Sequence, residues 1–172
     1  EDKRQAAVAA GRQWLAGDGK SATLHFPLKP QPSTSNLRPG HTLIAMGNNE
    51  RGGVEFDPNG KEIWSYPLRD CWTAARLANG NTMLASHSEH KLLEVTPDKK
   101  IVWEYSGTYI EIAVLDNGNI LTASQSDSRV TEIRKHDKSV VWEHRTDGNP
   151  VSIARLPNGN TIIGATGRDG IH

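Results

Sequence analysis

The sequence predicts an all-β chain built from a repeated four-stranded unit, and three observations carry that prediction. Tryptophans recur 39 residues apart, at Trp64, Trp103 and Trp142. Each unit also carries a leucine followed by a turn sequence, as in Leu77-Ala-Asn-Gly-Asn. No helical period is visible after Phe26, and the segments between apolar runs are short. A period near 40 residues with short strands is typical of the blades of a β-propeller.

The four strands of a unit follow from the apolar runs and the turns between them. The first strand is expected at 72–77, 110–115 and 151–156, and it ends in an Asn-Gly hairpin that we expect to be a type I′ turn. The second is expected at 42–46, 82–86, 119–124 and 161–165. The third is expected at 53–56, 92–96 and 130–134, and the fourth carries the tryptophan. An α-solenoid would need a 3.6-residue period, and a β-helix would need a shorter repeat.

The residues before the repeats differ in composition. Residues 1–15 are rich in alanine and predict a short N-terminal helix, which Gly17 and Gly19 end. Residues 21–26 predict one short strand, and the prolines of 27–32 predict an extended linker. We therefore divide the chain into an N-terminal segment, 1–32, and about three and a half blades. The blade boundaries are 33–68, 69–107, 108–148 and, for a partial blade, 149–172.

Composition restricts the classes of function. The 20 Lys and Arg residues balance the 20 Asp and Glu residues, which argues against a surface that binds nucleic acid. Cys71 is the one cysteine, so no intramolecular disulfide or CxxC metal motif is present. No apolar run is long enough to span a bilayer. The first residue is Glu1, which fits a processed signal peptide or a trimmed chain, and both remain open.

Two phrases carry a family resemblance, Phe56-Asp-Pro-Asn-Gly-Lys-Glu-Ile-Trp64 and Ala75-Arg-Leu-Ala-Asn-Gly-Asn-Thr82. They resemble the repeats of pyrroloquinoline-quinone-like β-propellers and of bacterial arylsulfotransferase-like propellers, over roughly residues 33–172. The resemblance implies the blade architecture. The vicinal cysteine pair that serves the quinone in that family has no counterpart here, so we carry over no catalytic residue and expect no cofactor.

The repeated side chains have a structural interpretation. One tryptophan per unit, at Trp64, Trp103 and Trp142, predicts an aromatic side chain that covers apolar surface between blades, with the alternative of an exposed ring of stacking platforms. A glutamate also recurs in the third strand of each unit, at positions 55, 94 and 132. We expect it to bridge to a neighbouring blade or to face water.

The candidate binding site lies at the end of the blades where the loops differ between repeats, because function usually resides on variable loops held by a rigid scaffold. The polar and aromatic residues best placed there to bind a ligand are Arg69, Trp72, His87, Tyr109, Glu111, Arg145 and Arg168.

Metal and nucleotide sites are not predicted. His87 and His90 flank Glu89, but two loop histidines do not supply the four ligands of a zinc site. No nucleophile elbow, P-loop or dinucleotide fingerprint occurs in the sequence.

The number of repeats leaves the ring incomplete, because propellers close with about four to eight blades. Three explanations are open. The chain is a fragment of a longer protein, two copies close one ring, or the early strand at 21–26 completes the last blade. We favour the first explanation, with assembly second.

The sequence therefore favours a non-catalytic bacterial binding or scaffold module, periplasmic or secreted, that contacts a protein or a small polar ligand. The alternative is a quinoprotein-like or sulfotransferase-like enzyme acting at the central channel of a completed propeller. A purely assembly role, in which open blade edges recruit further copies, is a third hypothesis.

Overall fold

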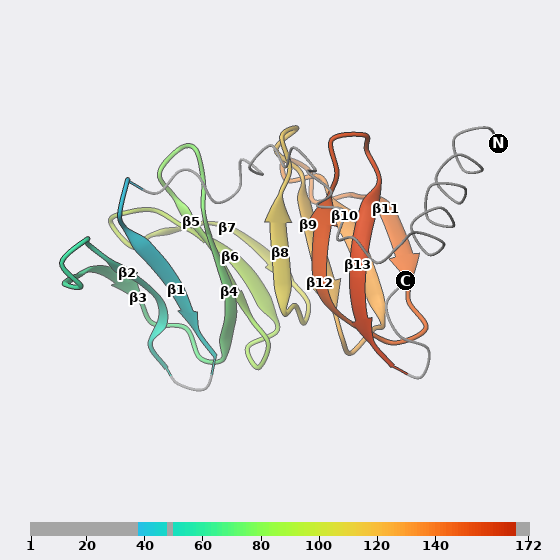
Figure 1. Ribbon diagram of the computed structural model, residues 1–172, viewed down its shortest axis with the longest axis horizontal. Helices are drawn as coiled ribbons and strands as arrows, with labels where there is room; N and C mark the ends of the chain where they lie inside the picture. The colour runs from blue at the N-terminus through green and yellow to red at the C-terminus, as the bar shows by residue number, and fades with distance from the viewer. Residues whose placement is uncertain (1–37, 48–49, 168–172) are drawn as a thin grey trace, which may run out of the picture.

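The computed structural model describes residues 38–47 and 50–167, which form thirteen strands in four antiparallel sheets (Figure 1). We name the sheets blades 1 to 4. Blade 1 holds β1 (Thr42–Met46), β2 (Gly52–Phe56) and β3 (Glu62–Tyr66). Blade 2 holds β4 (Cys71–Arg76), β5 (Thr82–Ser86), β6 (Lys91–Val95) and β7 (Ile101–Ser106). Blade 3 holds β8 (Glu111–Val114), β9 (Ile120–Ser124), β10 (Arg129–Ile133) and β11 (Val140–Arg145). Blade 4 holds β12 (Asn149–Arg155) and β13 (Thr161–Thr166).

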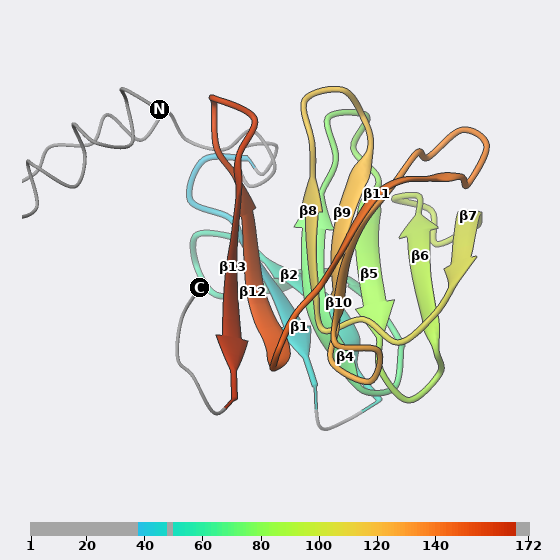
Figure 2. The same cartoon turned by 90° about the vertical axis from the view of Figure 1, so that its right-hand side faces the viewer.

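Within each blade the strands pair in chain order, and the blades stand side by side in chain order (Figure 1). The first strands of blades 2, 3 and 4 contact one another, β4 with β8 and β8 with β12. The outer strands β7 and β11 lie away from them, as Figure 2 shows from the blade 4 side. This is the blade arrangement of a β-propeller, as the sequence predicts. The predicted N-terminal helix, the 21–26 strand and the 27–32 linker lie outside the described residues.

The hairpins between first and second strands differ from the predicted type I′ turn. In blade 2 the amide of Gly80 donates to the carbonyl of Leu77, at 3.0 Å. Gly80 has a φ of 85°, whereas Asn79 is not among the residues with positive φ. A type I′ turn needs positive φ at both central residues, so that prediction was wrong. The glycine instead closes a four-residue turn, and Asn79 accepts a hydrogen bond from the amide of Asn81 at 3.0 Å.

The core lies between the blades rather than within one sheet. Blades 1 and 2 enclose a cluster around Leu84 and Leu93, and blades 2 and 3 enclose one around Met83 and Ile120. Blades 3 and 4 meet at a third cluster, around Leu121. Each blade therefore depends on its neighbours for burial, as expected for a stacked repeat.

A residue on the outward face of blade 4 is more exposed than its equivalents in blades 2 and 3. Met83, Leu121 and Ile162 occupy the same register position in blades 2, 3 and 4, each opposite an alanine of the first strand. Met83 and Leu121 are fully buried, whereas Ile162 is 48% exposed. On the side of blade 4 that points away from blade 3, Ile162 is thus left largely exposed. None of the described residues forms a helix long and apolar enough to cross a membrane.

Blades 1 and 2 approach closely at Gly53 of β2. A Cβ atom at this position would lie 2.6 Å from Cδ2 of Leu84, which is fully buried in blade 2, and 3.5 Å from the ring of Trp64. Glycine is therefore required here by the space between the sheets and not by its backbone angles.

We expect Gly53→Ala to destabilise the protein by about 1–3 kcal/mol, because the added methyl group overpacks a closed interface. Urea unfolding of the variant and the wild type measures the difference. The control for backbone entropy is Ala78→Gly, because Ala78 lies in an exposed turn. Gly60→Ala is unsuitable, because Gly60 has a φ of 77° and a side chain there would strain the backbone. Equal stability of Gly53→Ala and wild type would contradict this account of the interface.

Candidate functional site

The turn end of the blades, where the Asn-Gly hairpins lie, holds a repeated ionic contact that we call the glutamate clasp. Its members are the third-strand glutamates Glu55, Glu94 and Glu132, each with its partner cation. Glu55 pairs with Arg76 of the next blade, and Glu132 pairs with Arg155 of the next blade at 2.6 Å. Glu94 pairs with the ammonium group of Lys135, from blade 3. Each clasp therefore joins one blade to the following one.

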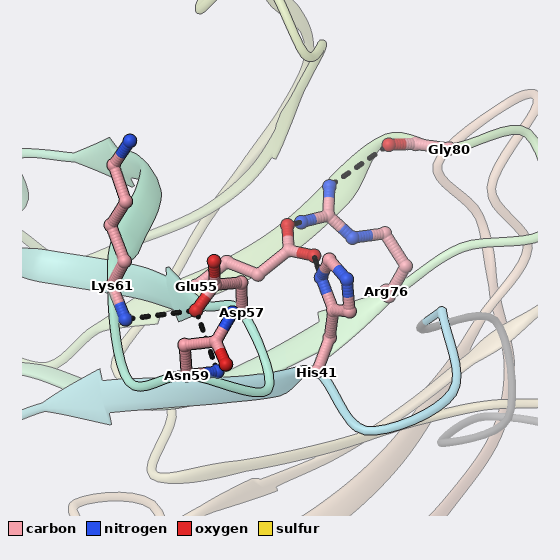
Figure 3. A network of polar contacts seen from close by, with 7 residues as sticks. All are labelled: His41, Glu55, Asp57, Asn59, Lys61, Arg76 and Gly80. Atoms are coloured by element: carbon pink, nitrogen blue, oxygen red, sulfur yellow. Dashed lines mark hydrogen bonds and ion pairs between the residues drawn. The ribbon is translucent and has the colours of Figure 1, made fainter.

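The same glutamates also bond to the hairpin of their own blade. Asn81 donates to Glu94, and Asn119 donates to Glu132, both at 2.7 Å. In blade 1 a histidine replaces this asparagine, and Nδ1 of His41 lies 2.9 Å from Glu55 (Figure 3).

Burial and hydrogen bonding act in opposite directions on Glu94. Its side chain is 3% exposed, and burial alone would raise its pKa. Hydrogen bonds from Lys135, Asn81 and Asn79 outweigh burial, so the pKa of Glu94 lies below its ordinary value and the side chain is a carboxylate. The clasp thus places a satisfied negative charge inside the interface, where removal of its partner would be costly.

The repeated tryptophans take part in the same contacts. The Arg76 guanidinium lies 5.3 Å from the centre of the Trp64 ring, and the Arg155 guanidinium lies 5.7 Å from that of Trp142. Such distances permit a cation–π attraction. The indole N–H of Trp64 donates to the carbonyl of Pro97 in blade 2 at 3.1 Å. That of Trp103 donates to the carbonyl of Lys135 in blade 3 at 2.8 Å.

The opposite, variable-loop end presents Trp72 to solvent. Trp72 lies at a β-bulge, where the pairing of β4 with β5 shifts between Cys71 and Thr73, and its side chain is 51% exposed. Trp72 lies between the buried residues Cys71 and Thr73, and the bulge leaves it without a pairing partner on β5.

Trp72 and His87, both predicted as site residues, lie together. Their ring centroids are 6.5 Å apart in an edge-on arrangement. Nδ1 of His87 lies 3.6 Å from a carboxylate oxygen of Asp70, and the backbone of Gly47 in blade 1 lies beside the indole. The arrangement offers an aromatic surface with a polar rim, which suits stacking against a planar or partly apolar group.

The other predicted residues that the structure describes make separate contacts. Arg69 has an exposed side chain, and its amide donates to Glu89 at 2.9 Å. Tyr109 is 8% exposed and donates its hydroxyl to the carbonyl of Ser106 at 3.2 Å, and burial raises its pKa. Arg145 is exposed at the end of the outer strand β11. Arg168 lies outside the described residues.

Glu111 begins β8, the first strand of blade 3, and is partly buried. Burial raises its pKa above the ordinary value, and a backbone hydrogen bond from Ile112 only partly offsets that effect. Among residues 38–47 and 50–167, no cation lies within ion-pair distance of its carboxylate. Within the same ranges, no group of three His, Cys, Asp or Glu side chains could hold a metal ion.

Sequence reasoning missed the cations of the clasp. Arg76 and Arg155 each begin the sequence motif Arg-Leu-x-Asn-Gly-Asn, and the two copies lie two repeats apart. That signal could have identified them as the partners of the recurring glutamates. Lys135 and Asp70 have no such repeated pattern, so the structure alone reveals their contacts.

Comparison with known proteins supports the fold. No protein-family model and no curated protein matches the chain. Among solved structures, the chain is similar to the WD40 β-propeller domain of Doa1, at 18% identity and a TM-score of 0.64, over 73% of this chain and 44% of that one. It is also similar to a catalytically inactive virginiamycin B lyase from Staphylococcus aureus with quinupristin, at 15% identity and a TM-score of 0.62, over 86% and 54%.

A third similar structure is BBS1N in complex with ARL6DN, at 17% identity and a TM-score of 0.52, over 72% of this chain and 42% of that one. The chain spans about half the length of these proteins. At such identities the likeness shows the β-propeller fold and no activity. The three proteins include both scaffold and enzyme members, so the fold alone does not choose between them.

We expect Glu111→Gln to stabilise the protein at neutral pH, raising the melting temperature by roughly 2–4 °C. A raised pKa means that the folded state holds this proton more tightly than the unfolded chain does. The wild type therefore loses stability as the pH rises from about 4.5, the ordinary value, through the folded-state pKa. Glutamine cannot ionise and escapes this loss.

Melting curves of both proteins between pH 4 and pH 8 test this expectation. The difference in melting temperature between Glu111→Gln and the wild type should be smallest at pH 4 and should grow as the pH rises to 8. A constant difference over the whole range would contradict the assignment of a disfavoured charge to Glu111.

Proposed function

We propose that the chain is part of a non-catalytic β-propeller that binds a protein or a small polar ligand through its variable-loop end. The observation that carries the proposal is the exposed Trp72, set at a bulge beside His87 and Asp70. An aromatic side chain that is half exposed on a rigid strand costs free energy unless a partner covers it, and such residues are enriched at binding hot spots.

The contrast between the two ends of the blades supports this choice. At the turn end, the buried carboxylates and their cations bond to one another across blade interfaces, as Glu55 and Arg76 do. In the clasps of Glu55 and Glu132 the glutamate already holds an arginine of the chain, so these two interfaces offer a ligand little. At the loop end, Trp72 and the Arg69 side chain face solvent. The equivalents of Trp72 are Ile110 in blade 3, which is 9% exposed, and Val151 at the matching bulge of blade 4, which is 37% exposed, so only blade 2 places an aromatic side chain at this position among blades 2 to 4.

The proposal includes completion of the ring. The apolar side of blade 4, marked by Ile162, requires a further blade, supplied either by more of the same polypeptide or by a second copy. A central channel would exist only in that closed form. The proposed periplasmic or secreted location rests on the sequence resemblance.

The alternative function is an enzyme acting at the central channel, of the quinoprotein-like or sulfotransferase-like type. One observation favours it: Glu111, on the first strand of blade 3, has a raised pKa and lacks a cationic partner among the described residues. A carboxyl group whose pKa is raised by burial is a candidate general acid. Glu111→Gln distinguishes the functions, because the enzyme hypothesis predicts that a captured small molecule is still bound but no longer converted.

The binding proposal is tested by retention of material on the immobilised full chain from an extract of the cells that make it, quantified by mass spectrometry. We expect Trp72→Ala to reduce the specifically retained species by about tenfold or more, the loss typical of an aromatic hot spot. Ile101→Ala, which truncates an equally exposed apolar side chain on β7, should leave retention unchanged. The proposal fails if both variants retain the wild-type set, or if the wild type retains nothing specific.

A further inference from the structure

The three blade interfaces are built on one pattern, and two of them place an arginine at its centre. Arg76 and Arg155 are the last residues of the first strands of blades 2 and 4. Each guanidinium pairs with the clasp glutamate and lies over a tryptophan, as described above. Each also donates to a carbonyl of its own hairpin, Arg76 to Gly80 at 3.0 Å and Arg155 to Gly159 at 3.4 Å. The glutamate, the tryptophan and the hairpin carbonyl of each of these interfaces together bind a guanidinium group.

The interface between blades 2 and 3 keeps these groups but lacks the arginine. Val114 stands at the equivalent register position, opposite Ile120 as Arg76 stands opposite Thr82. The glutamate and the tryptophan of this interface, Glu94 and Trp103, are present, and two lysines of blade 3 contact them. Lys135 pairs with Glu94, and Nζ of Lys138 lies 5.9 Å from the centre of the Trp103 ring.

A pocket of about 400 Å³ lies where the longer side chain is missing. Its apolar lining includes Leu77 and Met83 of blade 2 and Val114, Leu115 and Ile120 of blade 3. An aliphatic chain can be buried against such walls. Arg76 also lines this pocket, but its charge is directed to Glu55 and to the Gly80 carbonyl.

The charged side chains that line this pocket are Arg76, Lys135 and Asp116, and the two cations already pair with Glu55 and Glu94. Asp116 lines it from the blade 3 hairpin, where the other two hairpins carry Ala78 and Pro157. Asp116 is exposed, and no ion pair to it occurs among the described residues. Lys135, which lines the pocket, pairs with Glu94, and Gly118, the counterpart of Gly80, also lines the pocket. The interface that lacks the arginine therefore has an additional carboxylate, that of Asp116, at the pocket.

We propose that this pocket binds the side chain of an arginine that the chain does not itself supply. The aliphatic part lies against Val114, Leu115 and Met83. The guanidinium is held by Asp116 and, on displacing the Lys135 ammonium, by Glu94. A planar guanidinium can bond a carboxylate through two parallel N–H groups, which a lysine ammonium cannot do, so the exchange favours the arginine. The arginine belongs to a partner protein or is the free amino acid, and the two sources share this chemistry.

The chain offers a site-specific reporter, because it contains only two methionines, Met46 and Met83. Met83 lines the pocket, and Met46 ends β1 at the variable-loop end. The experiment is a titration of the full chain, labelled with 13C at the methionine methyl groups, with Nα-acetyl-arginine amide. We expect a saturable shift of the Met83 resonance and none of the Met46 resonance. Free arginine, titrated in parallel, distinguishes the two sources: tighter binding of the capped amide indicates a partner protein.

Two variants sharpen the test. Val114→Arg fills the pocket from within and should abolish the Met83 shift. Lys135→Ala lowers the stability of the protein, because it leaves the buried Glu94 without its cation, but it removes the internal competitor and should tighten binding of the arginine amide roughly tenfold, the size expected for one charge-assisted hydrogen bond. An unchanged Met46 resonance in each variant shows that the fold is retained. If Val114→Arg does not fold, the Lys135→Ala result alone decides.

Matched ligands define the outcomes that would overturn the proposal. Nα-acetyl-norleucine amide has an aliphatic side chain without the charge, and equal binding of this ligand would show an apolar cavity only. Preferential binding of Nα-acetyl-norleucine with a free carboxylate would show an anion site on Lys135. The absence of a Met83 shift with the arginine amide, in the wild type and in Lys135→Ala, would also refute the assignment.

Discussion

The structure depends on how one sheet is fixed against the next. Stacked blades have apolar faces that could slide or rotate, because hydrophobic contact has little directional preference. The buried carboxylate of each clasp, as in Glu55 with Arg76, removes that freedom. A buried charge must find its partner in one geometry, since leaving it unpaired costs several kcal/mol. The clasp therefore fixes the register of neighbouring blades while the apolar clusters supply most of the burial.

This constraint separates the two ends of the molecule. At the turn end, the third-strand glutamate bonds to the cation of each interface and to an asparagine of its own hairpin, or to His41 in blade 1. Hairpin and turn sequences are consequently similar from blade to blade there. At the loop end no such requirement operates, so individual residues such as Trp72 can project outward without disturbing the stack. Variation is thus widespread at the loop end, whereas at the turn end the interface between blades 2 and 3 departs from the common pattern, with Val114 in place of the arginine.

Much of the fold could be predicted from the sequence, because each blade repeats the same alternation and the same turn. The second strands were located to the residue at 42–46 and 82–86, where β1 and β5 lie. The turn type was predicted wrongly, because the preference of Asn-Gly for type I′ turns is only a statistical tendency. Here Gly80 closes a longer turn, and Asn79 lies outside the positive-φ region. The candidate site was less predictable. Nothing in the sequence reveals that Tyr109 is buried beneath its own loop or that Asp70 lies near His87, because both depend on how loops fold back.

The most direct test of the clasp is a double-mutant cycle on Glu55 and Arg76, using Glu55→Gln, Arg76→Met and the pair, with stability measured by urea unfolding. The account predicts that each single change costs about 3 kcal/mol, since each leaves a buried group without its partner. The double variant should cost little more than one single change, giving a coupling energy of about 2–3 kcal/mol. Additive losses, with a coupling near zero, would show that the pair does not fix the blades and would contradict the account.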